Sequence, residues 1–179
     1  KSHLDFYKNA KAVFFQTEFQ KGLFEKNNVE GNFISFGTTP YSNKEFSFFR
    51  KLVRENKGPR TRKFAVMESN NDIKNTKGAV DYCIKAKLDF DMIPPMKRES
   101  FLLKLAEYSA LVFFPMTPES CSRLATEARV LGLNMITPQI YGAPGEAWFS
   151  LTGEDLVDEL ERITVEVSMP TLKEYLPNG

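Results

Sequence analysis

The sequence predicts a doubly wound α/β fold, in which helices cover both faces of a parallel β-sheet. Short runs of β-branched and aromatic residues alternate along the chain with amphipathic stretches of about ten to fourteen residues. The chain has 179 residues, 42% of them hydrophobic and 16 of them Phe, so it can build a substantial core. No internal repeat or low-complexity segment interrupts this alternation.

The first elements alternate in the expected way. We expect a helix, a strand, a helix and a strand before a Gly/Pro/Ser-rich stretch, GTTPYSNKE, which separates them from an amphipathic helix. The ranges of these five elements are 2–10, 12–16, 17–27, 32–36 and 43–56.

The middle of the chain continues the pattern with two strand–helix pairs. Each strand is a short β-branched or aromatic run, and Phe101, Leu102, Leu105 and Tyr108 form an apolar stripe along the second helix. The expected ranges are 62–67 and 88–93 for strands, and 75–87 and 97–109 for helices.

The last part of the chain adds three strands and two helices. Gly132 ends the first helix as its C-cap, and Leu156, Leu160 and Ile163 form the apolar stripe of the second. The expected strands cover 110–114, 133–137 and 147–151, and the expected helices cover 120–131 and 153–165.

Composition narrows the class of protein. A formal net charge of +1 argues against a general nucleic-acid binder. The sequence has no apolar run of 18 residues and no signal peptide, and Cys83 and Cys121 are too few to staple a fold. These features favour a cytoplasmic protein. The chain begins at Lys1 with no Met, as expected of a truncated or processed product.

Residues 110–137, ALVFFPMTPESCSRLATEARVLGLNMIT, carry the strongest functional signal. A buried strand leads into a helix N-terminus, where free N–H groups and the helix dipole attract anions. Glu119 stands at the mouth of that helix, and Glu127 stands eight positions further on. An anion site alone would not favour carboxylates, but carboxylates can bind the sugar or ribose hydroxyls that lie beside a phosphate in a nucleotide-sugar. The segment therefore predicts a nucleotide-sugar site.

This segment resembles the C-terminal half of retaining glycosyltransferases of the GT-B architecture, the family-four group. The shared pattern is a strand ending in Pro, a Glu, a small-residue loop, a helix with a second Glu eight residues on, and a Gly before the next strand. The resemblance, weaker over about residues 63–160, implies a Rossmann-like domain that binds a nucleoside-diphosphate sugar. Glu119 would be catalytic and bind the donor sugar, Glu127 would bind ribose, and the helix mouth would bind the diphosphate. The residues of that mouth are Ser120, Cys121, Ser122, Arg123 and Leu124. The alternative is a Glu119 that only complements the helix dipole and a solvated Glu127.

Lys77-Gly78 matches the Lys-Gly of the same family, whose lysine contacts the diphosphate. The family arginine a few residues earlier has no counterpart here, and Lys74 and Arg123 are the possible substitutes. The alternative is a solvated Asn-rich turn with Lys77 on the surface. The missing arginine puts catalysis in doubt more than the fold.

Residues 1–40 resemble the last strand–helix–strand of the acceptor-binding domain of these enzymes. Residues 41–179 would then be the donor domain, with most of the acceptor domain upstream. The alternative is that residues 1–36 form the first unit of a small self-contained domain.

The segment LDFDMIPP holds a metal motif and a candidate base site. Asp89 and Asp91 have the Asp-x-Asp form of a metal site, but strand alternation explains them better, and we expect no metal or cofactor. In the family, the loop of Pro94, Pro95 and Met96 lies against the nucleobase; otherwise it is a rigid connection.

The loop IYGAPGEAWF corresponds to a Gly-rich turn and a glutamate that lie near the donor sugar in the family. Gly142, Ala143 and Glu146 occupy about those positions. Trp148 is expected to cap the sheet rather than cover a sugar.

The sequence lacks the residues that nucleophilic catalysis by a Ser–His–Asp or Cys–His set requires. The only histidine is His3, so no Ser–His–Asp or Cys–His set forms, and Cys121 is better explained as core than as a nucleophile. Eight cations between Lys44 and Lys63 offer peripheral membrane contact, where lipid-linked acceptors lie, or simply a solvated surface. The predicted function is glycosyl transfer to a carbohydrate or lipid-linked acceptor. The alternatives are a non-catalytic nucleotide- or sugar-binding module and a structural α/β domain.

Overall fold

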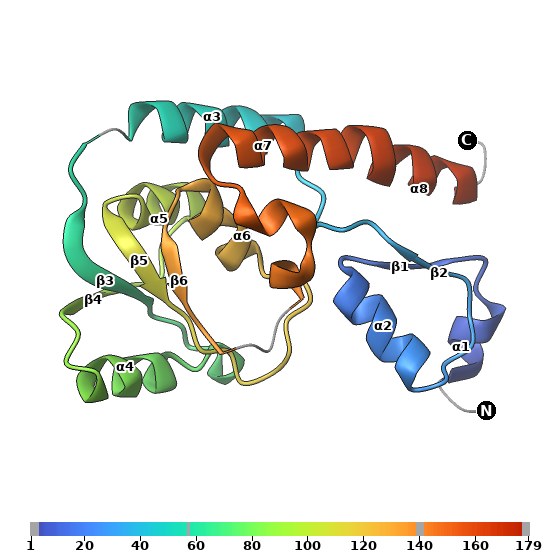
Figure 1. Cartoon of the computed structure of the whole chain (residues 1–179), viewed down its shortest axis with the longest axis horizontal. Helices are drawn as coiled ribbons and strands as arrows, with labels where there is room; N and C mark the ends of the chain where they lie inside the picture. The colour runs from blue at the N-terminus through green and yellow to red at the C-terminus, as the bar shows by residue number, and fades with distance from the viewer. Residues whose placement is uncertain (1–3, 57, 139–141, 177–179) are drawn as a thin grey trace.

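The computed structural model describes residues 4–56, 58–138 and 142–176, and it shows a Rossmann-like α/β fold with parallel sheets (Figure 1). The predicted fold class is confirmed. The strands are β1 (Val13–Phe15), β2 (Phe33–Ser35), β3 (Thr61–Met67), β4 (Phe90–Ile93), β5 (Tyr108–Val112) and β6 (Asn134–Ile136). The α-helices are α1 (Leu4–Asn9), α2 (Glu18–Lys26), α3 (Asn43–Glu55), α4 (Thr76–Lys85), α5 (Arg98–Leu105), α6 (Arg123–Val130), α7 (Gly153–Arg162) and α8 (Met169–Tyr175).

The larger sheet has the strand order β4-β3-β5-β6, with every neighbouring pair parallel. Successive residues of its central strands face opposite sides. Ala65 and Leu111 belong to the main core, whereas Val66 and Val112 belong to a smaller one. Helices α3, α5, α6 and α7 lie over the first face and α4 over the second (Figure 1). The four strands therefore end together at one edge of a sheet that is buried on both sides.

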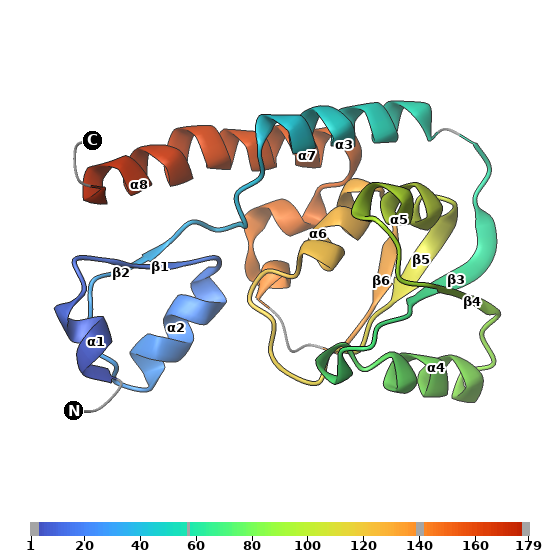
Figure 2. The same ribbon diagram turned by 180° about the vertical axis from the view of Figure 1, so that it is seen from behind.

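Residues 4–36 form a second, smaller unit around the two-stranded parallel sheet β1-β2. Its interior is aromatic, with Phe15, Phe24 and Phe33 in mutual ring contact. Helix α8 also lies beside this unit (Figure 2), and the ring of its Tyr175 packs edge-on against Phe14, with the ring centres 5.6 Å apart. The sequence patterns did not predict α8, which a π-helical turn, η4 (Ile163–Ser168), joins to α7.

The strand predicted at residues 147–151 is wrong, since residues Ala147–Ser150 form the 3₁₀ helix η3. Trp148 anchors this turn, because its indole Nε1 donates to the Gly37 carbonyl oxygen at 2.6 Å and its side chain is buried. A tertiary contact to Gly37, the residue directly after the smaller unit, thus overrides the strand-like local composition.

Two helix boundaries also differ from prediction. Helix α5 ends at Leu105, and β5 begins at Tyr108. Helix α6 begins at Arg123 instead of Ser120. The residues before α6 are held out of the helix by the smaller unit and the segment that follows it: the Ser120 and Thr17 hydroxyls lie 2.7 Å apart, and Thr39 donates to the Cys121 carbonyl at 3.4 Å. Within the described ranges, no helix is long and apolar enough to span a bilayer.

Candidate functional site

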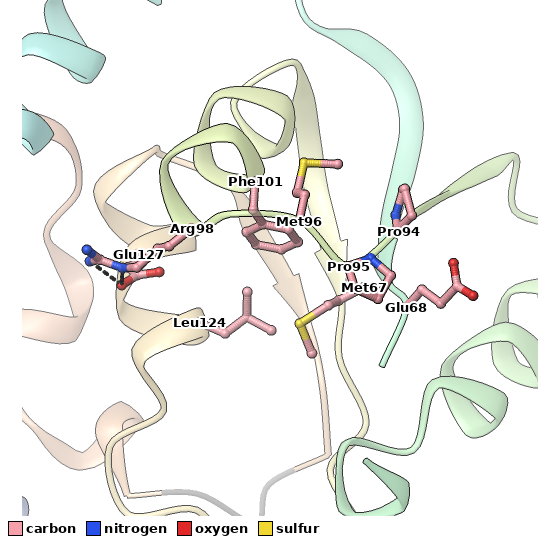
Figure 3. A pocket seen from close by; sticks show the side chains of 9 residues that line it. All are labelled: Met67, Glu68, Pro94, Pro95, Met96, Arg98, Phe101, Leu124 and Glu127. Atoms are coloured by element: carbon pink, nitrogen blue, oxygen red, sulfur yellow. Dashed lines mark hydrogen bonds and ion pairs between the residues drawn. The ribbon is translucent and has the colours of Figure 1, made fainter. Parts of the chain in front are cut away.

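A pocket of about 330 Å³ opens at the carboxyl edge of the larger sheet (Figure 3). It begins where β3 and β4 end, and α5 and α6 form its other walls. Ligands in open α/β sheets bind outside the carboxyl ends of the strands, so this is the expected position for a site. The lining residues are Met67, Glu68, Pro94, Pro95, Met96, Arg98, Phe101, Leu124 and Glu127. Five of them are predicted site residues: Pro94, Pro95, Met96, Leu124 and Glu127.

Glu127 lies at one end of the pocket, with only 6% of its side chain exposed. Arg98 donates to its Oε1 through Nε at 3.0 Å and Nη2 at 2.6 Å, and Arg123 Nε lies 3.6 Å from the same oxygen. The Oε2 oxygen points toward the cavity (Figure 3). One oxygen is therefore fixed by arginine, and the other faces a potential ligand.

Burial raises the pKa of the Glu127 carboxyl, although the hydrogen bonds and positive charge of Arg98 and Arg123 oppose that effect. Desolvation disfavours the charged form, while nearby cations favour it. A buried acid with a perturbed pKa in a pocket is a common feature of functional sites.

Glu45 of α3 completes the charged cluster. It accepts a hydrogen bond from Arg123 Nη2, and its Oε1 forms an ion pair with Arg98 Nη1 at 3.1 Å. Burial raises its pKa, but the hydrogen bonds from Ser42 and the contact with Arg123 outweigh burial and lower it overall. Sequence patterns did not identify Arg98 or Glu45 as site residues. Each is a first-turn helix residue, and only their distance in space, not their spacing in sequence, relates them to Glu127.

Tyr41 adjoins this cluster, and its hydroxyl is buried with no hydrogen-bond partner among the described residues. The Arg123 guanidinium lies over its ring at 4.7 Å. Burial, reinforced by the negative charge of Glu127, raises the pKa of the phenol well above its usual range. Tyr41 is therefore a neutral wall of the cluster.

Glu119 follows β5 and forms a separate ion pair. Lys74 Nζ lies 2.6 Å from its Oε1, and 14% of the Glu119 side chain is exposed. The same ammonium lies 5.6 Å from the centre of the Phe113 ring. Lys74, considered above as a substitute for the family arginine, thus contacts the residue predicted to be catalytic.

Lys77 and Gly78 lie in the first turn of α4. Lys77 is 89% exposed and pairs with Asp81 at 3.0 Å. The amide of Gly78 donates to the Asn75 side-chain oxygen at 3.0 Å, and a Cβ at Gly78 would collide with that side chain. Gly78 therefore permits the N-cap of α4, and neither residue is among those that line the pocket.

The mouth of α6 is built from three small residues. Ser122 is the N-cap but makes no side-chain cap hydrogen bond, which leaves the first-turn amides without that acceptor. Cys121 is buried, with its sulfur 3.8 Å from the Thr126 hydroxyl, as a core cysteine would be. Ser120 faces Thr17 of the smaller unit.

The loop of Gly142, Ala143 and Glu146 contacts the smaller unit. The Gly142 amide donates to the Glu119 carbonyl at 2.8 Å, and a Cβ at Gly142 would lie 2.7 Å from the Ser120 carbonyl oxygen. Ala143 is fully buried. Glu146 accepts from the backbone amide of Glu18 at 2.9 Å, and burial raises its pKa. This loop thus fixes the backbone around Glu119.

Asp89 directly precedes β4 and Asp91 lies within it, and β4 is an edge strand of the sheet. Lys63 lies 2.8 Å from Asp91, and the Tyr108 hydroxyl donates to Asp91 at 3.2 Å. These contacts explain the polar face of the strand. Among residues 4–56, 58–138 and 142–176, no three His, Cys, Asp or Glu side chains form a metal-binding group.

Several cations of the basic stretch are engaged within the molecule. Arg50 pairs with Asp158 at 2.6 Å and Glu161 at 2.5 Å, and Arg54 pairs with Glu154 at 2.7 Å. They join α3 to α7, so these two arginines are better explained as an interhelical contact than as a membrane surface.

Comparison with models of protein families, with curated proteins and with solved structures finds no match.

Proposed function

We propose that this chain binds a nucleoside-diphosphate sugar and forms the donor half of a retaining glycosyltransferase. The observation that carries the proposal is the pocket at the carboxyl edge of the larger sheet. Its walls are mainly apolar, and it ends at the buried carboxylate of Glu127. Binding pockets for small organic ligands combine apolar walls with a few oriented polar groups in this way.

The pocket suits the nucleoside. Leu124 and Met96 offer apolar surface to a flat base, and the Oε2 of Glu127 faces the cavity to accept hydrogen bonds from ribose hydroxyls (Figure 3). Arg98 holds Oε1 and so keeps the carboxylate oriented before a ligand arrives. Such preorganisation reduces the entropic cost of binding.

The diphosphate and sugar would lie between the mouth of α6 and Glu119. Free first-turn amides and Lys74 supply the positive potential, with Lys77 one turn away on α4. Glu119 would bind a hydroxyl of the sugar and give up part of its contact with Lys74 to the ligand. Donors fixed in this way stabilise a departing diphosphate without a metal ion. The acceptor oxygen would then bond to the anomeric carbon on the face that the diphosphate leaves, as the bond from that carbon to the diphosphate oxygen breaks and the departing diphosphate takes the acceptor's hydroxyl proton.

The smaller unit would belong to the acceptor side. Thr17 lies against Ser120, and Glu146 bridges to the first turn of α2, so this unit borders the loop that carries Glu119. A carbohydrate or lipid-linked acceptor would approach from there. Residues 4–36 would then be the last part of an acceptor domain.

A thermal-shift panel of UDP-, GDP- and ADP-sugars tests the binding step. A ligand that binds only the folded state stabilises it, by about 2.7 kcal/mol at one hundred times its dissociation constant. Any bound donor is then incubated with candidate acceptors, and NMR follows release of the nucleoside diphosphate and the anomeric configuration of the product. An inverted product would contradict the retaining mechanism, and the absence of any shift would contradict the nucleotide site.

One observation favours the second candidate, a binding module without catalysis. The family arginine is absent, and Lys77 pairs with Asp81 on the surface instead of facing the pocket. Stable binding without turnover, in a protein that carries a complete acceptor domain, would support this candidate.

A further inference from the structure

We infer that the pocket selects guanine as the base of its nucleotide, through the carboxylate of Glu68. The inference rests on the proposed nucleotide site and names the base that occupies it. It follows from which groups line the end of the pocket opposite Glu127.

The charged residues of the pocket lie at its two ends. Arg98 and Glu127 form one end, and Glu68 stands at the other, with the apolar side chains between them (Figure 3). If ribose occupies the Glu127 end, the base extends along the apolar walls toward Glu68. Its hydrogen-bonding edge then meets this carboxylate.

Glu68 is fixed at its backbone and free at its side chain. It follows β3 directly, and its amide donates to the Ile93 carbonyl at 2.9 Å, which holds it beside the loop after β4. The residue lines the cavity and is exposed, and among the described residues its carboxylate has no hydrogen-bond or ion-pair partner. Both of its oxygens are therefore available to accept.

The neighbouring loop strengthens this bias toward acceptors. Pro94 and Pro95 line the same end of the pocket, and proline has no backbone N–H. This wall can offer carbonyl oxygens but lacks two of the amide donors that other residues would supply. The ligand must therefore contribute hydrogen-bond donors on this side.

Guanine meets that requirement better than the other bases. Its N1–H and its 2-amino group are adjacent donors, which match the two oxygens of one carboxylate in a bidentate pair. Uracil presents a single N–H between two carbonyl oxygens, which would face the carboxylate unfavourably. Adenine and cytosine each present one amino group beside an acceptor nitrogen. A carboxylate therefore distinguishes guanine by two hydrogen bonds and by the absence of repulsion.

Calorimetric titration with GDP, IDP, UDP and ADP tests the inference on the wild type, Glu68→Gln and Glu99→Gln. Glu99 is an exposed glutamate of α5 outside the pocket and serves as the matched control. IDP keeps N1–H and lacks the 2-amino group. For the wild type we expect GDP to bind about 10- to 100-fold more tightly than UDP, with IDP between them.

The glutamine amide places a donor against guanine, so Glu68→Gln should reduce the GDP-to-UDP ratio to about threefold or less, whereas Glu99→Gln should leave it unchanged. The ratio is insensitive to a general loss of folded protein. UDP or ADP binding as tightly as GDP, or equal ratios in the two variants, would overturn the guanine assignment while leaving the nucleotide site intact. No binding of any diphosphate would overturn both.

Discussion

The two glutamates that the sequence placed eight residues apart are held in different ways. Glu127 lies within α6, and its carboxylate belongs to a cluster with Arg98, Arg123 and Glu45 that is packed against the core. Glu119 lies in the loop before α6, and among the described residues Lys74 is its one ion-pair partner. The Glu127 side chain is therefore held by a cluster from three helices, whereas the Glu119 side chain is held by Lys74 and its backbone by the Gly142 amide. Substitutions at the first centre should affect stability and binding strongly, and those at the second should affect mainly binding, with a smaller loss of stability.

The largest effect is expected from Arg98→Met. The substitution removes both close hydrogen bonds to Oε1 and leaves the buried Glu127 charge with Arg123 Nε at 3.6 Å. Breaking a buried pair costs about 3–5 kcal/mol, and the part exposure of Arg98 reduces this to about 2–3 kcal/mol. Urea unfolding measures the change in the free energy of unfolding.

The matched control is Lys8→Met, which removes the exposed pair of Lys8 with Glu30. Exposed pairs contribute little, so no measurable loss of stability is expected. The double variant Arg98→Met/Glu127→Leu should recover part of the lost stability, because it no longer leaves a buried charge unpaired. If Arg98→Met unfolds at the same urea concentration as the wild type, the cluster does not anchor the pocket.

The second prediction concerns ligand recognition at the same centre. Glu127→Gln keeps the shape of the side chain but weakens acceptance from ribose hydroxyls. We expect it to weaken GDP binding by about 1–3 kcal/mol, as for hydrogen bonds to a charged group. The 2′,3′-dideoxy analogue lacks those hydroxyls and should lose far less. If calorimetry shows that both nucleotides lose the same binding affinity, the ribose hydroxyls do not contact Glu127.

The alternation of hydrophobic runs was enough to predict the parallel sheet and the order of its helices. It predicted the strands β3 to β6 to within a few residues, because buried parallel strands are short and continuous in composition. It was wrong for residues 147–151, where the Trp148 bond to Gly37 fixes a 3₁₀ turn. Long-range contacts of that kind leave no periodicity in the sequence.

Some features of the candidate site could also be predicted from the sequence, and others depend on contacts between distant residues. The position of Glu127 at the carboxyl edge followed from strand and helix order, and the pocket does lie there. Arg98 could not be identified from the sequence, because its relation to Glu127 is a contact between two helices. Lys77 matched a motif, yet its side chain is exposed and pairs with Asp81. A motif specifies only the position of a residue in the sequence, whereas the direction of a long side chain depends on the residues that surround it in the fold.

The third prediction compares the two lysines. Lys74→Met removes the positive charge beside Glu119. It should weaken the binding of every nucleoside diphosphate by about 1 kcal/mol and leave the binding of nucleosides nearly unchanged. Lys77→Met should have a smaller effect, because that ammonium is largely exposed and screened by water. Lys77→Met should unfold like the wild type in urea, whereas Lys74→Met should lose some stability, though less than Arg98→Met, because it leaves the largely buried Glu119 carboxylate without this partner. If calorimetry shows that Lys77→Met weakens binding more than Lys74→Met does, the diphosphate binds beside Lys77, as the sequence motif predicts.

The smallest effect is a pH dependence at Glu127. Burial raises the pKa of its carboxyl above the ordinary 4.5, with Arg98 and Arg123 opposing the shift. The folded state therefore holds this proton more tightly than the unfolded chain, and the carboxyl stabilises the fold most below pH 4.5. That contribution is lost as pH rises from 4.5 through the raised value.

The amide side chain that Glu127→Gln introduces cannot titrate. The free energy of unfolding of the wild type, relative to that of this variant, should therefore fall with rising pH and then become constant. The pKa of the neighbouring Glu45 is lowered, but Glu45 is present in both proteins and largely cancels in the difference. Urea unfolding of both proteins at several pH values measures this difference. A relative stability that rises with pH would show that the arginines outweigh burial, and that Glu127 is ionised more readily in the folded protein than in the unfolded chain.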